Sequence, residues 1–270
     1  MVSPVPVLSI VFCIVSALIC FGIPVGLAIH CIRHTPKGHG MMAICTGAIC
    51  FIVSALVLEQ IFHSLVLGLV PGLTKIPAAY IVYGCLAAGV FEETARLLGL
   101  RFLCKRQSDS PLMGLAYGAG HGGIEAIMLS GTTMISNVMV MVAINAGSSD
   151  TLLSGLEGDT YDAALAQLQQ ISAIAPTDFL ASGVERLAAM GLHVALSMLI
   201  WMVATKRLPL WGYALAIVLH ALTNVPAGLY QTGVVTSIWL IEALTVLLVA
   251  CVGVVVWKLY QTHQKAPAAD

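Results

Sequence analysis

The chain has 270 residues, of which 59% are hydrophobic and only 9% are charged, and its formal net charge is −1. Soluble domains carry roughly 25% charged residues, so a soluble fold of this length could not cover its surface. The bilayer is therefore the expected solvent, and the lack of a basic block argues against nucleic-acid binding. The eight cysteines lie in or beside apolar runs without a CxxC pair, which argues against a zinc ribbon or a disulfide scaffold.

Seven apolar segments are long enough to cross a bilayer, which takes roughly 20 residues. We expect spans at approximately 5–32, 41–67, 78–103, 112–143, 179–204, 211–232 and 234–260. The fourth is long for one crossing, and its glycines between Gly114 and Gly123 predict a kink or a break. The predicted fold class is all-α: one integral membrane domain over residues 1–270 with about seven transmembrane helices.

The basic residues predict the orientation of these spans. The segments after even-numbered spans contain one basic residue, Lys75. The segments after odd-numbered spans contain nine: Arg33, Lys37, Arg101, Lys105, Arg106, Lys206, Arg207, Lys258 and Lys265. Since positive charge marks the cytoplasmic side, we expect the N-terminus outside and the C-terminus in the cytoplasm. The protein is then a multi-pass protein of a cell membrane, expected to be the bacterial plasma membrane.

The segment 146–178 becomes an acidic extracytoplasmic loop in this orientation. It contains no Lys or Arg and five acidic residues. Within it, Tyr161, Ala164, Leu165, Leu168 and Ile171 recur at helical spacing. This pattern predicts a short amphipathic helix that lies on the outer surface.

Ionisable residues inside the spans are the functional candidates, because each costs about 2.5–3.5 kcal/mol on insertion scales. Glu92, His121, His193 and His220 come from four different spans, and each lies about ten to twelve residues from the cytoplasmic end of its span. At 1.5 Å per residue, this places all four about 15–18 Å from the inner surface. Scattered structural residues would not be expected to share one depth.

Local spacing groups further residues with these four. Glu92 and Glu93 precede Arg96 by four and three residues, so that either glutamate can pair with the arginine on the same helix. His121 and Glu125 are one turn apart, as are His220 and Asn224, and Arg186 is nearly aligned with His193. We regard Arg96, Glu125, Arg186 and His193 as supporting residues.

Peptide hydrolysis is the chemistry that fits this set. A carboxylate beside an imidazole can deprotonate a water, and an imidazole beside a carboxamide can stabilise an oxyanion. The glycines around His121 would let a substrate backbone approach closely. A zinc site is the competing interpretation of the same side chains, with His121, His193 and His220 as ligands. Neither of the zinc-protease motifs HExxH and HxxEH is present.

Three motifs carry a family resemblance: Phe91-Glu92-Glu93-Thr94-Ala95-Arg96, Gly120-His121-Gly122-Gly123-Ile124-Glu125-Ala126 and His220-Ala221-Leu222-Thr223-Asn224. Together they resemble the YhfC family of intramembrane peptidases. That family is similar to the wider superfamily of CAAX proteases and bacteriocin-processing (ABI) proteins. The resemblance covers nearly the whole chain and implies that Glu92 and His121 activate water, while His220 and Asn224 line an oxyanion site.

Two departures from the superfamily pattern leave alternatives open. The first motif is EExxR instead of EExxxR, so that either Glu92 or Glu93 could face the water. Glu125 is an additional acid after the second-motif histidine, and it competes with His121 for the same role.

The sequence thus predicts an intramembrane protease, of the glutamate type or zinc-dependent, that cleaves a peptide or a membrane protein near mid-membrane and is reached from the cytoplasm. Two other classes compete with this interpretation. The same buried residues could form the proton relay of a proton-coupled transporter. The chain could also be a non-catalytic membrane immunity or scaffold protein.

Overall fold

The computed structural model describes residues 2–36, 38–106 and 110–264, and the secondary structure of this part is entirely helical. The helices are α1 (Val7–His34), α2 (His39–Phe51), η1 (Ile52–Leu58), α3 (Glu59–Leu69), η2 (Leu73–Lys75), α4 (Pro77–Arg106), α5 (Pro111–Glu125), η3 (Ala126–Gly131), α6 (Thr132–Asn145), α7 (Ser149–Leu153), α8 (Gly158–Ala173), α9 (Pro176–Ala204), α10 (Trp211–Gln231) and α11 (Ile238–His263). The predicted all-α class is confirmed.

Six helices of the described chain are long and apolar enough to cross a membrane: Val7–His34, His39–Leu69, Pro111–Asn145, Pro176–Ala204, Trp211–Gln231 and Ile238–His263. They coincide with six of the seven predicted spans. The remaining predicted span coincides with α4, which has 30 residues. Its second half carries Glu92, Glu93, Arg96 and Arg101, so that α4 is the most polar of the long helices.

Two of the long helices are interrupted by π-helical turns. One turn, η3, follows the glycine-rich α5, and the predicted irregularity of the fourth span is therefore found one turn beyond the glycines. The other, η1, lies between α2 and α3 and was not predicted. Such turns widen the helix locally and are common at functional sites.

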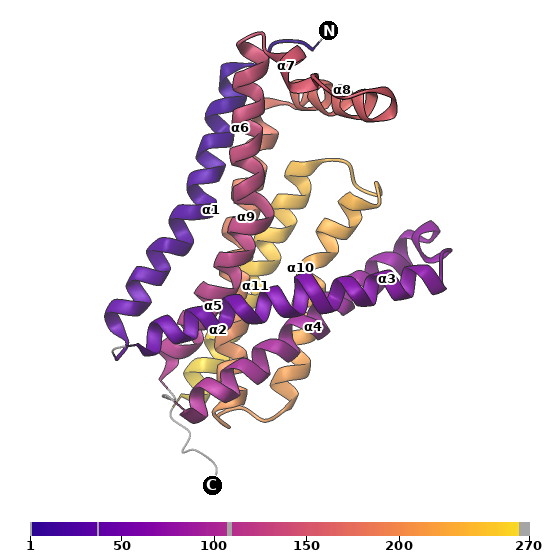
Figure 1. The fold of residues 1–270 in the computed structure, drawn as a ribbon. Helices are drawn as coiled ribbons and strands as arrows, with labels where there is room; N and C mark the ends of the chain where they lie inside the picture. The colour runs from indigo at the N-terminus through magenta and orange to yellow at the C-terminus, as the bar shows by residue number, and fades with distance from the viewer. Residues whose placement is uncertain (1, 37, 107–109, 265–270) are drawn as a thin grey trace.

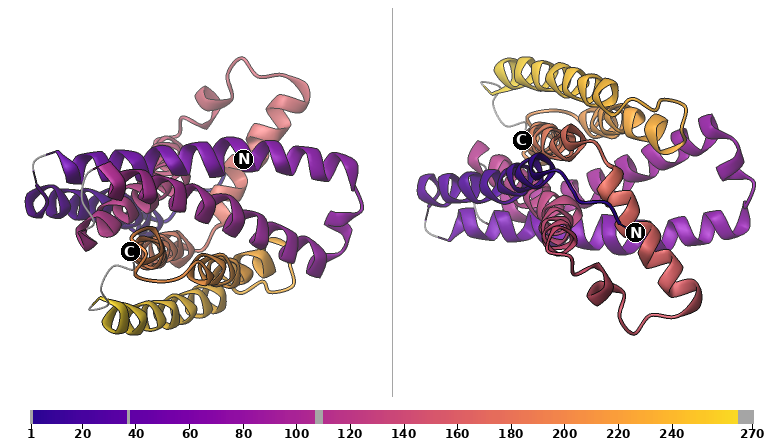
Figure 2. Two further views of the ribbon diagram at one scale, coloured as in Figure 1. Left: turned by 90° about the horizontal axis from the view of Figure 1, so that it is seen from below. Right: turned by 90° about the horizontal axis from the view of Figure 1, so that it is seen from above.

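The long helices pack in two directions. α1 packs side by side with α6 and α9, whereas α2–α3 crosses them steeply and forms a hairpin with α4 (Figure 1). Figure 2 shows α2–α3 running across the width of the molecule. α10 packs against α4, and α11 packs against α9 and α10.

The two ends of the bundle differ in charge. The C-terminal ends of α1, α4, α9 and α11 gather at one end, together with the beginnings of α2, α5 and α10 (Figure 1). We call it the basic end, because seven of the Lys and Arg residues named above lie at or beside these helix termini: Arg33, Arg101, Lys105, Arg106, Lys206, Arg207 and Lys258. α7 and α8 of the acidic loop lie at the opposite end (Figure 1).

The predicted amphipathic helix of the acidic loop is present as α8. Leu168 is buried, and Ala164, Leu165 and Ile171 pack in the same apolar cluster as Met141 and Phe179. The opposite face of α8 is exposed.

The main apolar core lies between the basic end and the middle of the bundle. Its fully buried members include Leu100, Leu103, Met113, Tyr117, Leu199 and Trp201, which come from the halves of α4, α5 and α9 nearest the basic end. The centre of this half of the bundle is therefore filled with side chains.

Candidate active site

The predicted functional side chains meet in the middle of the bundle. α4 supplies Glu92, Glu93 and Arg96, α5 supplies His121 and Glu125, α9 supplies Arg186 and His193, and α10 supplies His220 and Asn224. Glu93, Arg96 and His121 are 0% exposed, and Glu92, His193 and His220 are also buried. The common depth predicted from the sequence therefore corresponds to one cluster.

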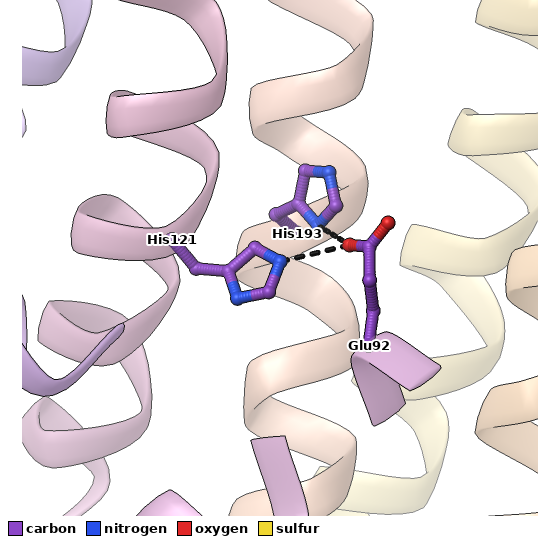
Figure 3. Close-up of side chains that lie close together, drawn as sticks. All are labelled: Glu92, His121 and His193. Atoms are coloured by element: carbon purple, nitrogen blue, oxygen red, sulfur yellow. Dashed lines mark hydrogen bonds and ion pairs between the residues drawn. The ribbon is translucent and has the colours of Figure 1, made fainter. Parts of the chain in front are cut away.

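Glu92 lies at the centre of this cluster. Its Oε2 atom is 2.8 Å from Nε2 of His121 and 4.0 Å from Nδ1 of His193, as Figure 3 shows. Its Oε1 atom is 3.9 Å from Nε2 of His220. The carboxylate thus lies between three imidazoles from three different helices.

Glu93 has different partners from its neighbour. Its Oε2 atom pairs with Nε of Arg96 at 3.0 Å, and its Oε1 atom is 2.8 Å from Nδ1 of His220. Adjacent residues of a helix point about 100° apart. Glu93 therefore turns away from the cavity and holds the far side of the His220 ring, while Glu92 faces its Nε2 atom.

Arg96 connects this pair to α9. Its guanidinium donates to the backbone oxygen of His193 at 2.9 Å and to Oγ of Ser197 at 2.5 Å, and it lies 3.0 Å from Nδ1 of His193. An arginine has no acceptor, so Nδ1 of His193 is the acceptor of that contact. Ser197 was not predicted, because a serine in an apolar helix gives no distinctive signal.

His193 is held from its other side by Glu125. Nε2 of His193 pairs closely with Oε2 of Glu125, and Oε1 of Glu125 is 2.7 Å from a guanidinium nitrogen of Arg186. Arg186 also pairs with Glu185, its neighbour in the chain. Glu125 thus belongs with His193 and Arg186, and His121 is the residue that contacts Glu92.

The glycines around His121 serve helix packing. A side chain at Gly120 would overlap the backbone of Ile44 in α2, and one at Gly118 or Gly122 would meet α9 at Val194 or His193. The prediction that they admit a substrate backbone is wrong. They allow α2 and α9 to approach α5 so closely that His121 lies between them.

A cavity of about 640 Å³ adjoins the cluster. Glu92, Glu125, His193, His220 and Asn224 line it, and Asn224 makes no hydrogen bond with the described part of the chain. The other lining residues are Gln60, His63, Leu67, Tyr80, Ile81, Tyr83, Gly84, Cys85, Glu185, Arg186, Ala189, Leu192, Thr223, Ala227, Gly228, Tyr230, Gln231, Ile238, Ile241, Glu242, Thr245 and Val249.

The cavity does not extend toward the basic end. The sequence predicted that the site is reached from the cytoplasm, and the side of access stays a prediction. Positions along a helix give the depth of a residue, but the side on which helices separate depends on their packing, which the sequence pattern does not give.

Two lining residues were assigned no role at the site from the sequence. His63 is 3.1 Å from Oε1 of Glu59 and 2.6 Å from the hydroxyl of Tyr83. The spacing of Glu59 and His63, one helical turn, could have indicated this pair. Glu242 is 4% exposed, and its Oε2 atom has no hydrogen-bond partner among the described residues.

The cluster has the donor types of a transition-metal site. Glu92, His121 and His193 each offer a ligand atom, and these atoms lie within 4.8 Å of one another. Carboxylate oxygen and imidazole nitrogen are ligands that zinc accepts. In this arrangement Nδ1 of His193 also accepts from Arg96, so that Glu92 and His121 are the more available ligands.

The fold and the site are those of a multi-pass membrane protein with a buried carboxylate–imidazole cluster. Residues 19–245 match the family described as YhfC intramembrane metalloprotease. The chain is also similar to the uncharacterized membrane protein YhfC of Bacillus subtilis (strain 168), with 37% identity over 246 residues that cover 90% of this chain and 93% of that protein. The chain therefore belongs to the YhfC family of intramembrane metalloproteases. No solved structure matches it.

Proposed function

We propose that this protein hydrolyses peptide bonds inside the membrane and that Glu92 is the base that activates the attacking water. The observation that carries the proposal is the position of Glu92: its two carboxylate oxygens face His121 on one side and His220 on the other, at the wall of the cavity. A water beside this carboxylate would reach both imidazoles. General-base catalysis of this kind contributes about 10²–10⁴-fold to a rate.

His121 orients the base. Its Nε2 atom lies at hydrogen-bond distance from Glu92, and in the tautomer with Nε2 protonated it donates to the carboxylate. Phe51 and Tyr117 lie against the His121 ring at centroid distances of 5.2 and 6.0 Å. The ring is thus fixed by packing and holds Glu92 in one position relative to the water.

His220 and Asn224 form the opposite half of the site. They are one turn apart on α10, both line the cavity, and the Asn224 amide is free to donate to a ligand. Glu93 accepts from Nδ1 of His220, so that a protonated His220 presents Nε2–H toward the cavity. These two donors could stabilise the oxyanion that forms when water attacks a peptide carbonyl.

Zinc is compatible with the same residues. Glu92 and His121 would hold it, and His193 would join them once its Nδ1 atom gave up its contact with Arg96; a bound zinc would polarise the water and the carbonyl as a Lewis acid. The remaining groups keep their roles: Glu93 and Arg96 position His220, and Glu125 and Arg186 position His193.

Cleavage by the purified protein tests this proposal. The protein is reconstituted in liposomes with a library of single-span membrane peptides, and products are identified by mass spectrometry. We expect cleavage by the unmodified protein and its loss in Glu92→Gln, His121→Ala and His220→Ala. Full activity in all three variants would exclude the proposed site.

Glu59→Gln is the matched control. Glu59 is also a buried glutamate of a membrane helix, 6% exposed, but it bonds to His63 and does not line the cavity. The same chemical change at this position should leave most of the cleavage intact.

Elemental analysis of the same preparations tests the metal. We expect zinc to copurify with the unmodified protein and to be lost in His121→Ala. Full cleavage by a metal-free preparation would show that Glu92 and His121 suffice without zinc.

A further inference from the structure

The cavity lies entirely on one side of the catalytic cluster. On α10, every lining residue lies between His220 and Gln231. On α4 they lie between Tyr80 and Glu92, on α9 between Glu185 and His193, and on α11 between Ile238 and Val249. The segments of α9, α10 and α11 extend from the cluster toward the end of the bundle opposite the basic end, whereas that of α4 extends toward the side of the bundle (Figure 1).

The other side of the cluster is closed. Leu100 and Tyr117 are 0% exposed and Trp201 is 1% exposed, and they belong to the apolar core that fills the bundle between the cluster and the basic end. Protein interiors of this kind have few voids larger than a water molecule. A peptide could not reach Glu92 through this core without separating α4, α5 and α9.

The cavity extends as far as the helix ends. Leu67 and Tyr80 lie next to the turn between α3 and α4, and Gln231 and Ile238 flank the turn between α10 and α11. From His220 to Gln231 on α10 is eleven residues of helix, or about 16 Å. The cavity is thus deep enough to connect mid-membrane with one membrane surface.

The wall of the cavity suits an extended peptide and its water. Gln60, Tyr83, Thr223 and Thr245 are neutral hydrogen-bonding residues along it, and Glu242 offers a buried oxygen without a partner among the described residues. Backbone N–H and C=O groups that are not in a helix need such partners at bilayer depth. A volume of about 640 Å³ is within the range of pockets that enclose a small ligand, so it has room for a short stretch of unfolded chain.

Charge identifies which surface this is. The seven Lys and Arg residues that lie at the basic end of the described chain mark that end as cytoplasmic, whereas the acidic loop 146–178 lies at the other end. We propose that the cavity opens to the extracytoplasmic surface and that the substrate is a membrane-protein segment that enters from that surface in extended form. The opening follows from packing and charge alone, whereas the substrate class rests on the proposed function.

Cysteine accessibility tests the side of the opening. Ala227→Cys on α10 and Thr245→Cys on α11 each place a thiol on the cavity wall. A membrane-impermeant, charged thiosulfonate is added to intact cells or to inside-out vesicles, and labelled positions are assigned by mass spectrometry, so that the native cysteines can stay. We expect both thiols to be labelled in intact cells and not in inside-out vesicles.

Two surface variants calibrate the experiment. Asp162→Cys reports the acidic loop and Lys258→Cys reports the basic end, and both positions are exposed. The proposal would be overturned if the cavity thiols were labelled in inside-out vesicles, as Lys258→Cys is. It would also be overturned if they were labelled in neither preparation while Asp162→Cys reacts in intact cells.

This experiment does not depend on proteolysis. Labelling from the outside without any peptide cleavage would leave the opening intact and contradict the proposed function. Peptide cleavage together with labelling only in inside-out vesicles would support the proposed function and contradict the extracytoplasmic opening.

Discussion

At the scale of single residues, the protein uses two adjacent glutamates differently. Glu92 faces the cavity between His121 and His220, whereas Glu93 is enclosed with Arg96 and the far side of His220. The helix geometry makes this division unavoidable, because neighbouring residues cannot face the same direction. Glu92 is therefore the candidate base, and Glu93 is the residue that positions His220.

The two glutamates should differ in the effect of the same substitution. Glu92→Gln removes the base and should lower the cleavage rate by about 10²–10⁴-fold. Glu93→Gln weakens the hold on His220 and removes the ion-pair partner of Arg96, and it should lower the rate by about 10–100-fold, as is usual for groups that orient a ligand or catalytic histidine. Cleavage rates of the two variants measure this difference, and equal losses would contradict the division of roles.

Arg96 should matter for stability as well as for activity. Arg96→Met leaves Glu93 as an unpaired buried charge, which costs about 3–5 kcal/mol in known cases. The double variant Arg96→Met, Glu93→Gln should recover most of this loss, because neither charge remains. Unfolding in detergent mixtures measures both, and a double variant as unstable as the single one would contradict the ion-pair account.

The sequence predicted which residues form the site, because ionisable groups at bilayer depth are rare and their depth follows from helical rise. It could not distinguish Glu92 from Glu93, because both have favourable spacing to Arg96. That distinction depends on the rotation of α4 about its axis, which the packing of α5, α9 and α10 determines. The wider superfamily similarity remains a prediction.

At the scale of helices, close contacts of α5 bring the site together. Gly120 lies against the backbone of α2 at Ile44, and Gly47 of α2 lies against the backbone of Tyr117. Because the run of glycines is packed on both sides, α5 stays regular and the π-helical turn follows it. The sequence predicted the irregularity but not its position, since a buried glycine run favours packing as readily as a kink.

A single added methyl group tests this packing. Gly120→Ala would place Cβ in the backbone of Ile44, which can only move together with α2, so we expect a loss of about 1–3 kcal/mol in stability. Gly253→Ala is the control, because a Cβ there meets nothing within 4 Å. Thermal unfolding of both variants is the measurement, and an unchanged midpoint for Gly120→Ala would contradict the observed packing.

At the scale of the whole molecule, one half of the bundle is packed and the other is hollow. The packed half next to the basic end gives the site a rigid base, and the hollow half gives it a polar wall. The sequence predicted seven long apolar helices from hydropathy, and six of those described are long and apolar enough to cross a membrane. It did not give the side on which the helices separate, because the steep crossing of α2–α3 depends on contacts far apart in the chain.

Blocking the hollow half should weaken the binding of substrate without altering the cluster. Ala227→Trp fills the cavity beyond His220 and should raise KM strongly, because substrate must pass this position. Ala214→Trp on the same helix is the control, because that position is exposed near the basic end and does not line the cavity. The measurement is the KM of each variant. Equal KM values for Ala227→Trp and Ala214→Trp would show that the substrate does not pass through the cavity.

The central claim is that Glu92 activates water to hydrolyse peptide bonds. Its most direct test is proteolysis in H₂¹⁸O, with ¹⁸O in new carboxyl termini of membrane peptides measured by mass spectrometry for the unmodified protein and Glu92→Gln. We predict ¹⁸O-labelled termini with the unmodified protein and none with Glu92→Gln. Labelled termini at equal yield from both proteins would contradict the account.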